Sequence, residues 1–216
     1  MGELTSLSEA LENYQPPTQS RKISAGDKIL QVEDLQRSLN VSSLNNTFEN
    51  FLARAGAAEA LKTVRALADG TANYDMVLLY GGVGNGKTHL CEATAIYIYE
   101  NEKKLLRVRT FSEVINILKA KMQRDEPGVS YDQFLQMLCM TGRLIVDDIG
   151  MGGTDRQYGF EILEQIVVAR YQRQLWTLMV SNKDISELPE RVSDRFADSQ
   201  ISRMVLVEAG SYRGMK

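Results

Sequence analysis

The chain has 216 residues, of which 44% are hydrophobic and 25% charged, and this ordinary composition excludes a wholly disordered chain. Its 25 basic and 28 acidic side chains leave a net charge of −3, so binding to nucleic acid would need a local basic patch. No run approaches the roughly 18 apolar residues of a membrane helix, and we expect a cytoplasmic protein that does not contact membranes.

Residues 1–45 differ in composition from the rest of the chain. Leucines recur there at helical spacing before Pro16 and Pro17, and a second amphipathic segment covers residues 32–39. We interpret this region as a short helical arm that is partly flexible and docks on a partner; a disordered leader is the equal alternative. Residues 46–216 are predicted to form one folded domain.

Strands and helices alternate along that domain. Thr47 is a candidate helix cap and Gly70 a helix terminator. The apolar runs that we predict to be buried strands are residues 76–80, 105–109, 144–147, 176–180 and 204–207. The predicted helices are residues 57–69, 87–101, 111–124, 130–141, 156–173 and 187–197. This order predicts an α/β fold with a parallel sheet between helices.

A glycine-rich segment directly after the first strand matches the pattern G-x-x-x-x-G-K-[ST]. Its glycines would let backbone N–H groups face phosphate oxygens, Lys87 would bridge the β- and γ-phosphates of ATP, and the Thr88 hydroxyl would bind Mg²⁺. His89 follows on the helix, and we interpret it as a packing residue rather than a catalyst. The predicted nucleotide-binding residues of this segment are Gly81, Gly82, Val83, Gly84, Asn85, Gly86, Lys87, Thr88 and His89.

Two carboxylates end the predicted strand at residues 144–147. In a parallel sheet this edge faces the ligand crevice. Asp147 would orient the Mg²⁺ shell, and Asp148 would position the attacking water or accept its proton. After the next strand, Ser181-Asn182 places an amide where it would bond the water or the γ-phosphate.

Two arginines, Arg191 and Arg195, lie four residues apart on the last predicted helix. One interpretation is a solvated face on which they pair with Glu190 and Asp194. The other is that an arginine reaches the nucleotide of a neighbouring subunit and neutralises charge in the transition state. The residues alone leave these two interpretations balanced.

Taken in order, these motifs resemble those of AAA+ ATPases, in the branch of DnaC/DnaI helicase loaders and IstB. The run Gly84-Asn-Gly-Lys-Thr-His-Leu90 is similar to that branch's phosphate loop, as are Asp147-Asp-Ile-Gly150, Ala169-Arg-Tyr171 and Ser211-Tyr-Arg213 to its other signatures. Thr47-Phe-Glu-Asn-Phe51 resembles the segment that precedes the ATPase core. Gly82 stands where many relatives carry proline, and Asp148 where many carry glutamate.

The resemblance implies roles for individual residues. Asn182 would be the sensor-1 residue, Arg195 the arginine finger with Arg191 beside it, and Arg213 the sensor-2 arginine on the γ-phosphate. It also implies the sheet order 5-1-4-3-2, residues 46–216 as the ATPase domain without a helical lid domain, and assembly into a spiral or ring. A lone subunit would hydrolyse ATP slowly.

We therefore expect an ATP-dependent loader that places a hexameric replicative helicase on single-stranded DNA. Relatives bind this DNA through a helical insertion, here residues 111–141. Its candidate contacts are Lys119, Lys121, Arg124, Tyr131 and Phe134, although the aromatic pair fits the core better. The alternatives are an IstB-like ATPase that binds duplex DNA and stimulates a transposase, and a module that senses ATP with little hydrolysis.

Overall fold

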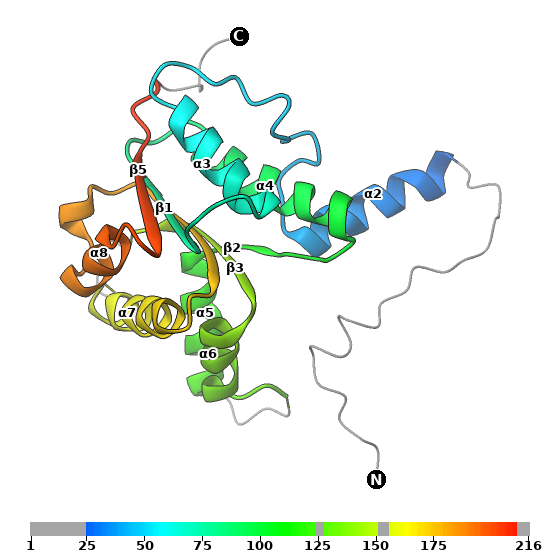
Figure 1. The fold of residues 1–216 in the computed structure, drawn as a ribbon. Helices are drawn as coiled ribbons and strands as arrows, with labels where there is room; N and C mark the ends of the chain where they lie inside the picture. Colours follow the sequence, from blue (N-terminus) through cyan, green and yellow to red (C-terminus); the bar gives the residue numbers. More distant parts are fainter. Residues whose placement is uncertain (1–24, 124–127, 151–155, 211–216) are drawn as a thin grey trace.

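The computed structural model describes residues 25–123, 128–150 and 156–210. They form three layers, with a parallel β-sheet between two layers of helices (Figure 1). This is the architecture expected where strands and helices alternate, because each crossover helix packs back on one face of the sheet. The predicted α/β class is confirmed.

The sheet has five strands, and each pairs in parallel with its neighbours. Their order in space, β2-β3-β4-β1-β5, is the predicted order 5-1-4-3-2 read from the other edge. The strands are β1 (Met76–Tyr80), β2 (Val108–Thr110), β3 (Arg143–Ile149), β4 (Trp176–Ser181) and β5 (Ser202–Leu206). Because β4 pairs with both β1 and β3, the carboxyl ends of these three strands meet at one edge of the sheet.

Alternate side chains of β1 belong to two separate cores. Val77 and Leu79 lie in the core under α3 and α4, whereas Met76 and Leu78 lie in the core on the opposite face. All four are fully buried, as expected for a strand covered on both faces. The first layer holds α3 (Ala58–Asp69) and α4 (Lys87–Glu102). The second holds α5 (Phe111–Gln123), α6 (Tyr131–Met140), α7 (Arg156–Gln172) and α8 (Glu190–Ala197).

The helix α2 (Ala25–Leu39) projects from the body of the molecule and joins it at its carboxyl end (Figure 1). Leu39 is fully buried in the core under α3 and α4. The carboxylate of Glu92, on α4, accepts hydrogen bonds from the Ser42 backbone N (2.8 Å), the Ser42 hydroxyl (3.0 Å) and the Asn46 amide (2.5 Å). The end of the segment that we interpret as an arm is therefore fastened to the core.

The prediction that a helix begins at Thr47 is wrong. The Thr47 hydroxyl accepts a hydrogen bond from the Asn50 backbone N (3.4 Å), and the Asn50 side-chain oxygen accepts one from the Thr47 backbone N (3.1 Å). These reciprocal bonds form a closed turn, because such side chains compete with helical backbone bonding. The next helix begins at Ala58 and ends, as predicted, before Gly70, whose φ is 76°.

The second strand begins three residues later than predicted and ends one residue later. The apolar run 105–109 contains Leu106, which is buried before the strand begins, while pairing with β3 covers only Val108–Thr110. The run identified a buried segment, but burial alone does not distinguish a strand from the loop that leads into it.

The last predicted helix, 187–197, is also divided. A short 3₁₀ turn, η1 (Ile185–Glu187), precedes Pro189, and α8 begins directly after this proline. Proline has no N–H to continue a helix and is well tolerated before its first turn, so it starts a new helix here.

Within the described ranges, no helix combines the length and the apolar character needed to cross a bilayer.

Candidate functional site

The phosphate loop joins β1 to α4 and turns through glycines with positive φ. The angles are 128° at Gly81, 83° at Gly84 and 93° at Gly86, a region that other residues rarely adopt. A Cβ on Gly81 would also lie 2.7 Å from the Val207 carbonyl oxygen. At Gly82 no described atom lies within 4 Å of such a Cβ, so glycine is not required there for space.

Lys87 begins α4 and is only 3% exposed. Its ammonium donates hydrogen bonds to the carbonyl oxygens of Gly81 (2.8 Å) and Gly82 (2.7 Å) and to the Asn85 side-chain oxygen (2.8 Å). Burial lowers the pKa of Lys87 to about 8, while the nearby charges of Asp147 and Asp148 oppose this shift. The lysine therefore lies within its loop on neutral acceptors.

Asn85 has a structural role that the motif does not reveal. Its side chain is 2% exposed and donates a hydrogen bond to the Val207 carbonyl oxygen (2.5 Å) while accepting the bond from Lys87. Asn85 thus connects the loop to the chain just after β5. The buried amide is satisfied on both sides, as a buried polar group requires.

The two predicted acids adopt different environments at the end of β3. Asp147 is 4% exposed, and it accepts hydrogen bonds from the Asp148 backbone N (2.8 Å) and the Thr88 side chain. Burial raises the pKa of Asp147, and its hydrogen bonds oppose this rise. Asp148 is exposed and has a φ of 56°, at an irregularity in the pairing of β3 with β4. The irregularity turns the second acid out of the sheet.

Asn182 and Asp148 are in direct contact. The Asn182 amide donates a hydrogen bond to the Asp148 carboxylate (2.5 Å). Asn182 also lines a pocket of about 210 Å³ beside the phosphate loop. The residues lining it are Val83, Gly84, Asn85, Gly86, Lys87, Thr88 and Asn182. The structure therefore brings the loop, the acidic strand end and the predicted amide together at the carboxyl edge of the sheet.

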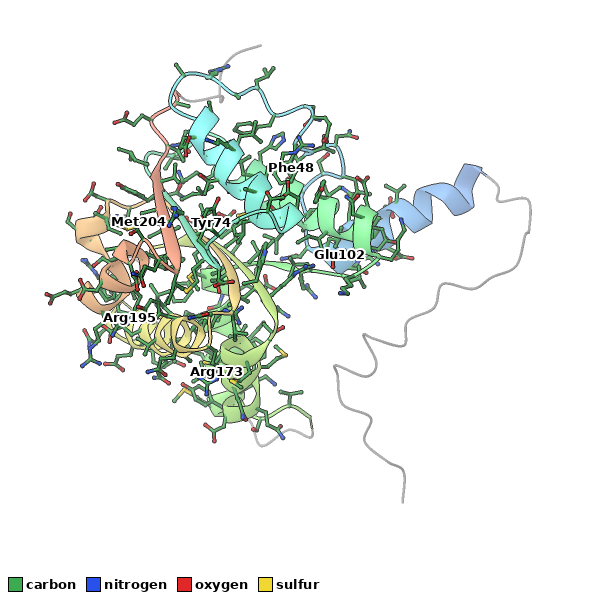
Figure 2. All side chains as sticks on the ribbon, viewed as in Figure 1. Phe48, Tyr74, Glu102, Arg173, Arg195 and Met204 are labelled. Carbon is green, nitrogen blue, oxygen red and sulfur yellow. The ribbon has the colours of Figure 1, made fainter. Side chains whose placement is uncertain are left out.

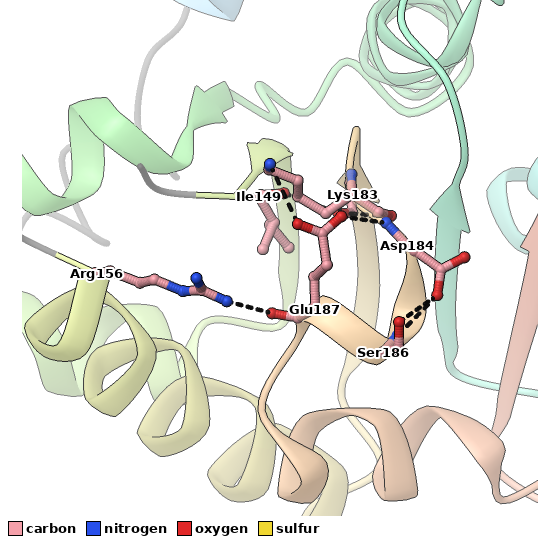
Figure 3. Close-up of polar contacts among 7 residues, drawn as sticks. Ile149, Arg156, Lys183, Asp184, Ser186 and Glu187 are labelled. Atoms are coloured by element: carbon pink, nitrogen blue, oxygen red, sulfur yellow. Dashed lines mark hydrogen bonds and ion pairs between the residues drawn. The ribbon is translucent and has the colours of Figure 1, made fainter. Parts of the chain in front are cut away.

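The loop that carries Asn182 is held by a local polar network (Figure 3). Asp184 accepts hydrogen bonds from the Ser186 backbone N (3.0 Å) and hydroxyl (2.7 Å), and Lys183 pairs with Glu187 at 3.3 Å. The Ser181 hydroxyl donates to the Ile149 carbonyl oxygen (2.8 Å), which joins the ends of β4 and β3. These contacts fix the backbone on both sides of Asn182.

His89 packs away from the phosphate loop. Its Nε2 lies 2.9 Å from the Thr47 carbonyl oxygen, and its ring meets the Phe51 ring edge-on at a centroid distance of 5.2 Å. His89 thus attaches the segment of residues 47–51 to α4. This is the packing interpretation made from the sequence.

The two arginines of α8 face different neighbours. The Arg195 guanidinium lies 5.0 Å from the centroid of the Tyr171 ring, whereas Arg191 is exposed and lies 3.8 Å from Glu164 of α7. Neither pairs with the neighbours suggested by the solvated-face interpretation. Arg213, the third predicted arginine, lies outside the described residues.

The helices α5 and α6 place their aromatic and basic residues at different depths. Phe134 is buried in the core, and Lys121 lies over its ring and donates to the Val129 carbonyl oxygen. Tyr131 is half-buried, and its hydroxyl accepts a hydrogen bond from that of Tyr158 at 3.4 Å. Arg124 lies outside the described residues.

Tyr158, on α7, was missed from the sequence. The ammonium of Lys119 lies 5.9 Å from the centroid of its ring, and its hydroxyl lies 3.7 Å from the sulfur of Met122, a side chain that is 65% exposed. Its neighbours come from α5 and α6, so only the fold brings them together.

Comparison with known proteins identifies the family. A model of the bacterial DnaA ATPase domain matches residues 43–201. The chain therefore belongs to the bacterial DnaA ATPase domain family, and the predicted resemblance to AAA+ ATPases of the DnaC/DnaI type is confirmed.

Individual relatives come from both initiators and loaders of replication. The chromosomal replication initiator protein DnaA of Geotalea uraniireducens (strain Rf4) is 31% identical over 163 residues, which cover 69% of this chain and 33% of that protein. The replicative helicase loader DnaC of Escherichia coli (strain K12) is 27% identical over 171 residues, 76% of this chain and 68% of DnaC. A crystal structure of the DnaC helicase loader has a TM-score of 0.61 at 20% identity, over 80% of this chain and 99% of that one. The chain spans about a third of the length of the DnaA relatives that it matches.

Proposed function

We propose that the site binds ATP with Mg²⁺ and hydrolyses it. The supporting observation is that a positive-φ glycine loop and a buried lysine line one pocket. Two acids lie against its lining residues, because Asp147 is hydrogen-bonded to Thr88 and Asp148 to Asn182. The hydrogen bond between Thr88 and Asp147 brings an alcohol and a carboxylate oxygen together, and hard cations such as Mg²⁺ prefer such oxygens. The bound ion would offset the negative charge of the phosphates.

Each residue then has a separate task. Lys87 would exchange its loop acceptors for phosphate oxygens, and the loop N–H groups would hold the remaining oxygens. Asp148 is exposed beside the pocket and would accept the proton of the attacking water. Asn182 would orient that water or the γ-phosphate, because its amide already lies against Asp148.

We propose that subunits assemble into a spiral or ring in which Arg195 completes the site of a neighbour. Its guanidinium lies over the ring of Tyr171 on α7, and among the described residues Arg195 does not line the pocket of its own chain. An arginine supplied in trans contributes about 10³–10⁵ to the rate in comparable nucleotide hydrolases. Arg191 would assist it, and Arg213 would contact the γ-phosphate in its own subunit.

We propose that this ATPase loads a hexameric replicative helicase onto single-stranded DNA. The relation to DnaC carries this proposal, because that match covers about two thirds of the loader. The arm, residues 1–45, would grip the helicase, and its fastening to Glu92 of α4 would connect that grip to the phosphate-loop helix.

Native mass spectrometry of the protein with the replicative helicase of its source and ATP tests the loader. The truncation to compare with the full chain removes residues 1–24 only, because a deletion to residue 45 would also remove buried Leu39 and the partners of Glu92. We expect a defined complex that weakens with the truncation. The absence of a complex under every nucleotide condition would contradict the loader and direct attention to the IstB-like alternative.

A surface on α5–α7 supports binding to single-stranded DNA. Lys119, Met122, Tyr131 and Tyr158 bring cationic and aromatic groups together there, and such groups suit backbone contact and base stacking. Tyr158→Ala should weaken the binding of oligo-dT about 5- to 100-fold, the range for loss of one stacking platform, as measured by fluorescence anisotropy. Tyr99→Ala, on α4, is the matched control and should bind normally. Tighter binding to duplex than to oligo-dT would favour the IstB-like alternative.

A further inference from the structure

We propose that Tyr171 is the positioning residue for Arg195, holding its guanidinium ready to act on the nucleotide of a neighbouring subunit. This inference rests on the proposed role of Arg195 in trans. Tyr171 lies in the last turn of α7, and Arg195 in the last turn of α8. Figure 2 marks Arg195 on the side of the sheet that α7 and α8 cover.

The first observation is how the arginine is held. Its guanidinium carbon lies 5.0 Å from the centroid of the Tyr171 ring, within the range of a cation–π contact. Within the described part of the chain, Arg195 forms no ion pair, and its buried Nε has no hydrogen-bond acceptor. The neighbouring Arg191, by contrast, lies 3.8 Å from the carboxylate of Glu164.

This difference matters for the charge that each arginine offers. A nearby carboxylate offsets the charge of an arginine, but at 3.8 Å Glu164 makes no hydrogen bond to the exposed Arg191 and leaves its side chain loosely held. An aromatic face orients the flat guanidinium and leaves both its charge and its outward donors for another anion. Arg195 is thus held in one orientation by the Tyr171 ring, whereas Arg191 is exposed and only loosely paired.

The second observation is how the ring itself is fixed. The Tyr171 hydroxyl donates a hydrogen bond to the Asp198 carboxylate (2.5 Å), and Asp198 also accepts one from the Gln200 backbone N (2.9 Å). The Arg195 carbonyl oxygen accepts a bond from the Ser202 hydroxyl (2.9 Å). The ring is held by the loop after α8, and the arginine backbone by the first residue of β5. Both partners of the stacked pair are therefore restrained.

Two substitutions separate the ring from its hydroxyl. Tyr171→Leu removes the aromatic face, and Tyr171→Phe keeps it while removing the bond to Asp198. We expect ATP turnover stimulated by assembly to fall about tenfold in Tyr171→Leu and less than threefold in Tyr171→Phe. A tenfold loss is smaller than the effect of an arginine finger, because the variant keeps Arg195 and loses only its orientation. ATP affinity of the monomer and the unfolding midpoint are measured for both. Tyr99→Leu, which removes a cation–aromatic contact with Lys103 on α4, is the matched control.

A mixing experiment distinguishes action in trans from a general structural effect. Tyr171→Leu subunits are titrated with Asp148→Asn subunits, which keep an intact Arg195 but should not hydrolyse ATP. If Tyr171 serves the arginine of its own subunit, turnover per Tyr171→Leu subunit should rise toward the wild-type value, because its pocket now meets an intact finger. Arg195→Ala subunits are mixed in the same way.

The results for the two variants test different parts of the proposal. A rise for Arg195→Ala without a rise for Tyr171→Leu would overturn the role of Tyr171 and leave the finger in place. No rise for Arg195→Ala would overturn the proposed finger itself. Lower ATP affinity of the Tyr171→Leu monomer would also contradict the positioning role, since the substitution would then affect its own pocket.

Discussion

Two buried cations, Arg170 and Lys87, lie at opposite edges of the same sheet and differ in the groups that they contact. Arg170, fully buried, donates to the carbonyl oxygens of Leu138 (2.9 Å), Thr141 (2.8 Å) and Trp176 (2.7 Å) and to the Thr177 hydroxyl (2.8 Å). These groups lie at the end of α6 and the start of β4, so the amino edge of the sheet is joined to a helix end. Lys87, at the carboxyl edge, also rests on oxygen acceptors, but all three of them belong to the phosphate loop.

The comparison gives a physical reason for the different roles that we propose, a structural one for Arg170 and a nucleotide-binding one for Lys87. Arginine has several donors in one plane and keeps its charge, so it can satisfy four fixed acceptors at once. Burial lowers the pKa of Arg170 to about 10, which still leaves it charged at neutral pH. Lysine is a compact charge on a flexible stem, and its pKa of about 8 lies close to neutrality. Its acceptors can be exchanged for those of a ligand.

The largest effect should follow from removing the structural cation. Arg170→Ala leaves four buried acceptors without their donor, so we expect the free energy of unfolding to fall by about 3–5 kcal/mol. Urea denaturation measures this change. Arg170→Lys keeps the charge but not the planar set of donors, so its free energy of unfolding should lie between those of the wild type and Arg170→Ala. A loss below about 1 kcal/mol for the alanine variant would show that water replaces the guanidinium freely.

Removing Lys87, the cation that we propose binds phosphate, should lower ATP affinity and leave the free energy of unfolding almost unchanged. Lys87→Ala deletes a desolvated ammonium, so the free energy of unfolding should change by less than about 1 kcal/mol. ATP affinity should fall at least ~100-fold, because two phosphates lose their charged partner. Calorimetric titration with ATP measures it, and Lys62→Ala, at an exposed position on α3, is the matched control. Normal ATP affinity of Lys87→Ala would overturn the assignment of the phosphate loop.

The sequence predicted the class of fold and the candidate site residues. It did not predict the local geometry of those residues. The five apolar runs identified the five strands of the described sheet, and in β1 and β4 the absence of alternation reflects burial on both faces. The motif predicted the loop, and the paired acids predicted the edge of β3. The positive φ of Asp148 and the bond from Asn85 to Val207 depend on contacts between distant segments. No local pattern encodes such contacts, and the same holds for Tyr158.

Arg170 illustrates this limit most clearly. It was identified only as part of the family signature Ala169-Arg-Tyr171, yet it binds groups from α6 and β4 as well. At Thr47 the sequence predicted a helix that the structure lacks, because the capping side chain closes a turn instead of starting a helix. Propensity describes what a side chain can bond, and tertiary packing decides which bond forms.

A smaller effect concerns pH. Because folding lowers the pKa of Lys87 from 10.5 to about 8, the folded protein binds fewer protons than the unfolded chain between these values, and this group makes stability rise with pH there. ATP affinity should move the other way, falling up to about tenfold per pH unit above pH 8 as the ammonium is lost. Titrations between pH 7 and 9.5 measure the slope. Lys87→Arg keeps its charge in this range and should remove the slope even if its affinity is lower.

The central claim is that the pocket at the carboxyl edge hydrolyses ATP. Its most direct test compares the steady-state turnover of the wild type and of Asp148→Asn over a range of protein concentrations, with ATP binding measured in parallel. We expect both proteins to bind ATP, turnover per wild-type subunit to rise with concentration as subunits assemble, and the Asp148→Asn rate to be lower by about 100-fold or more. Equal turnover in the two proteins would contradict the claim and leave a module that senses ATP without being an ATPase.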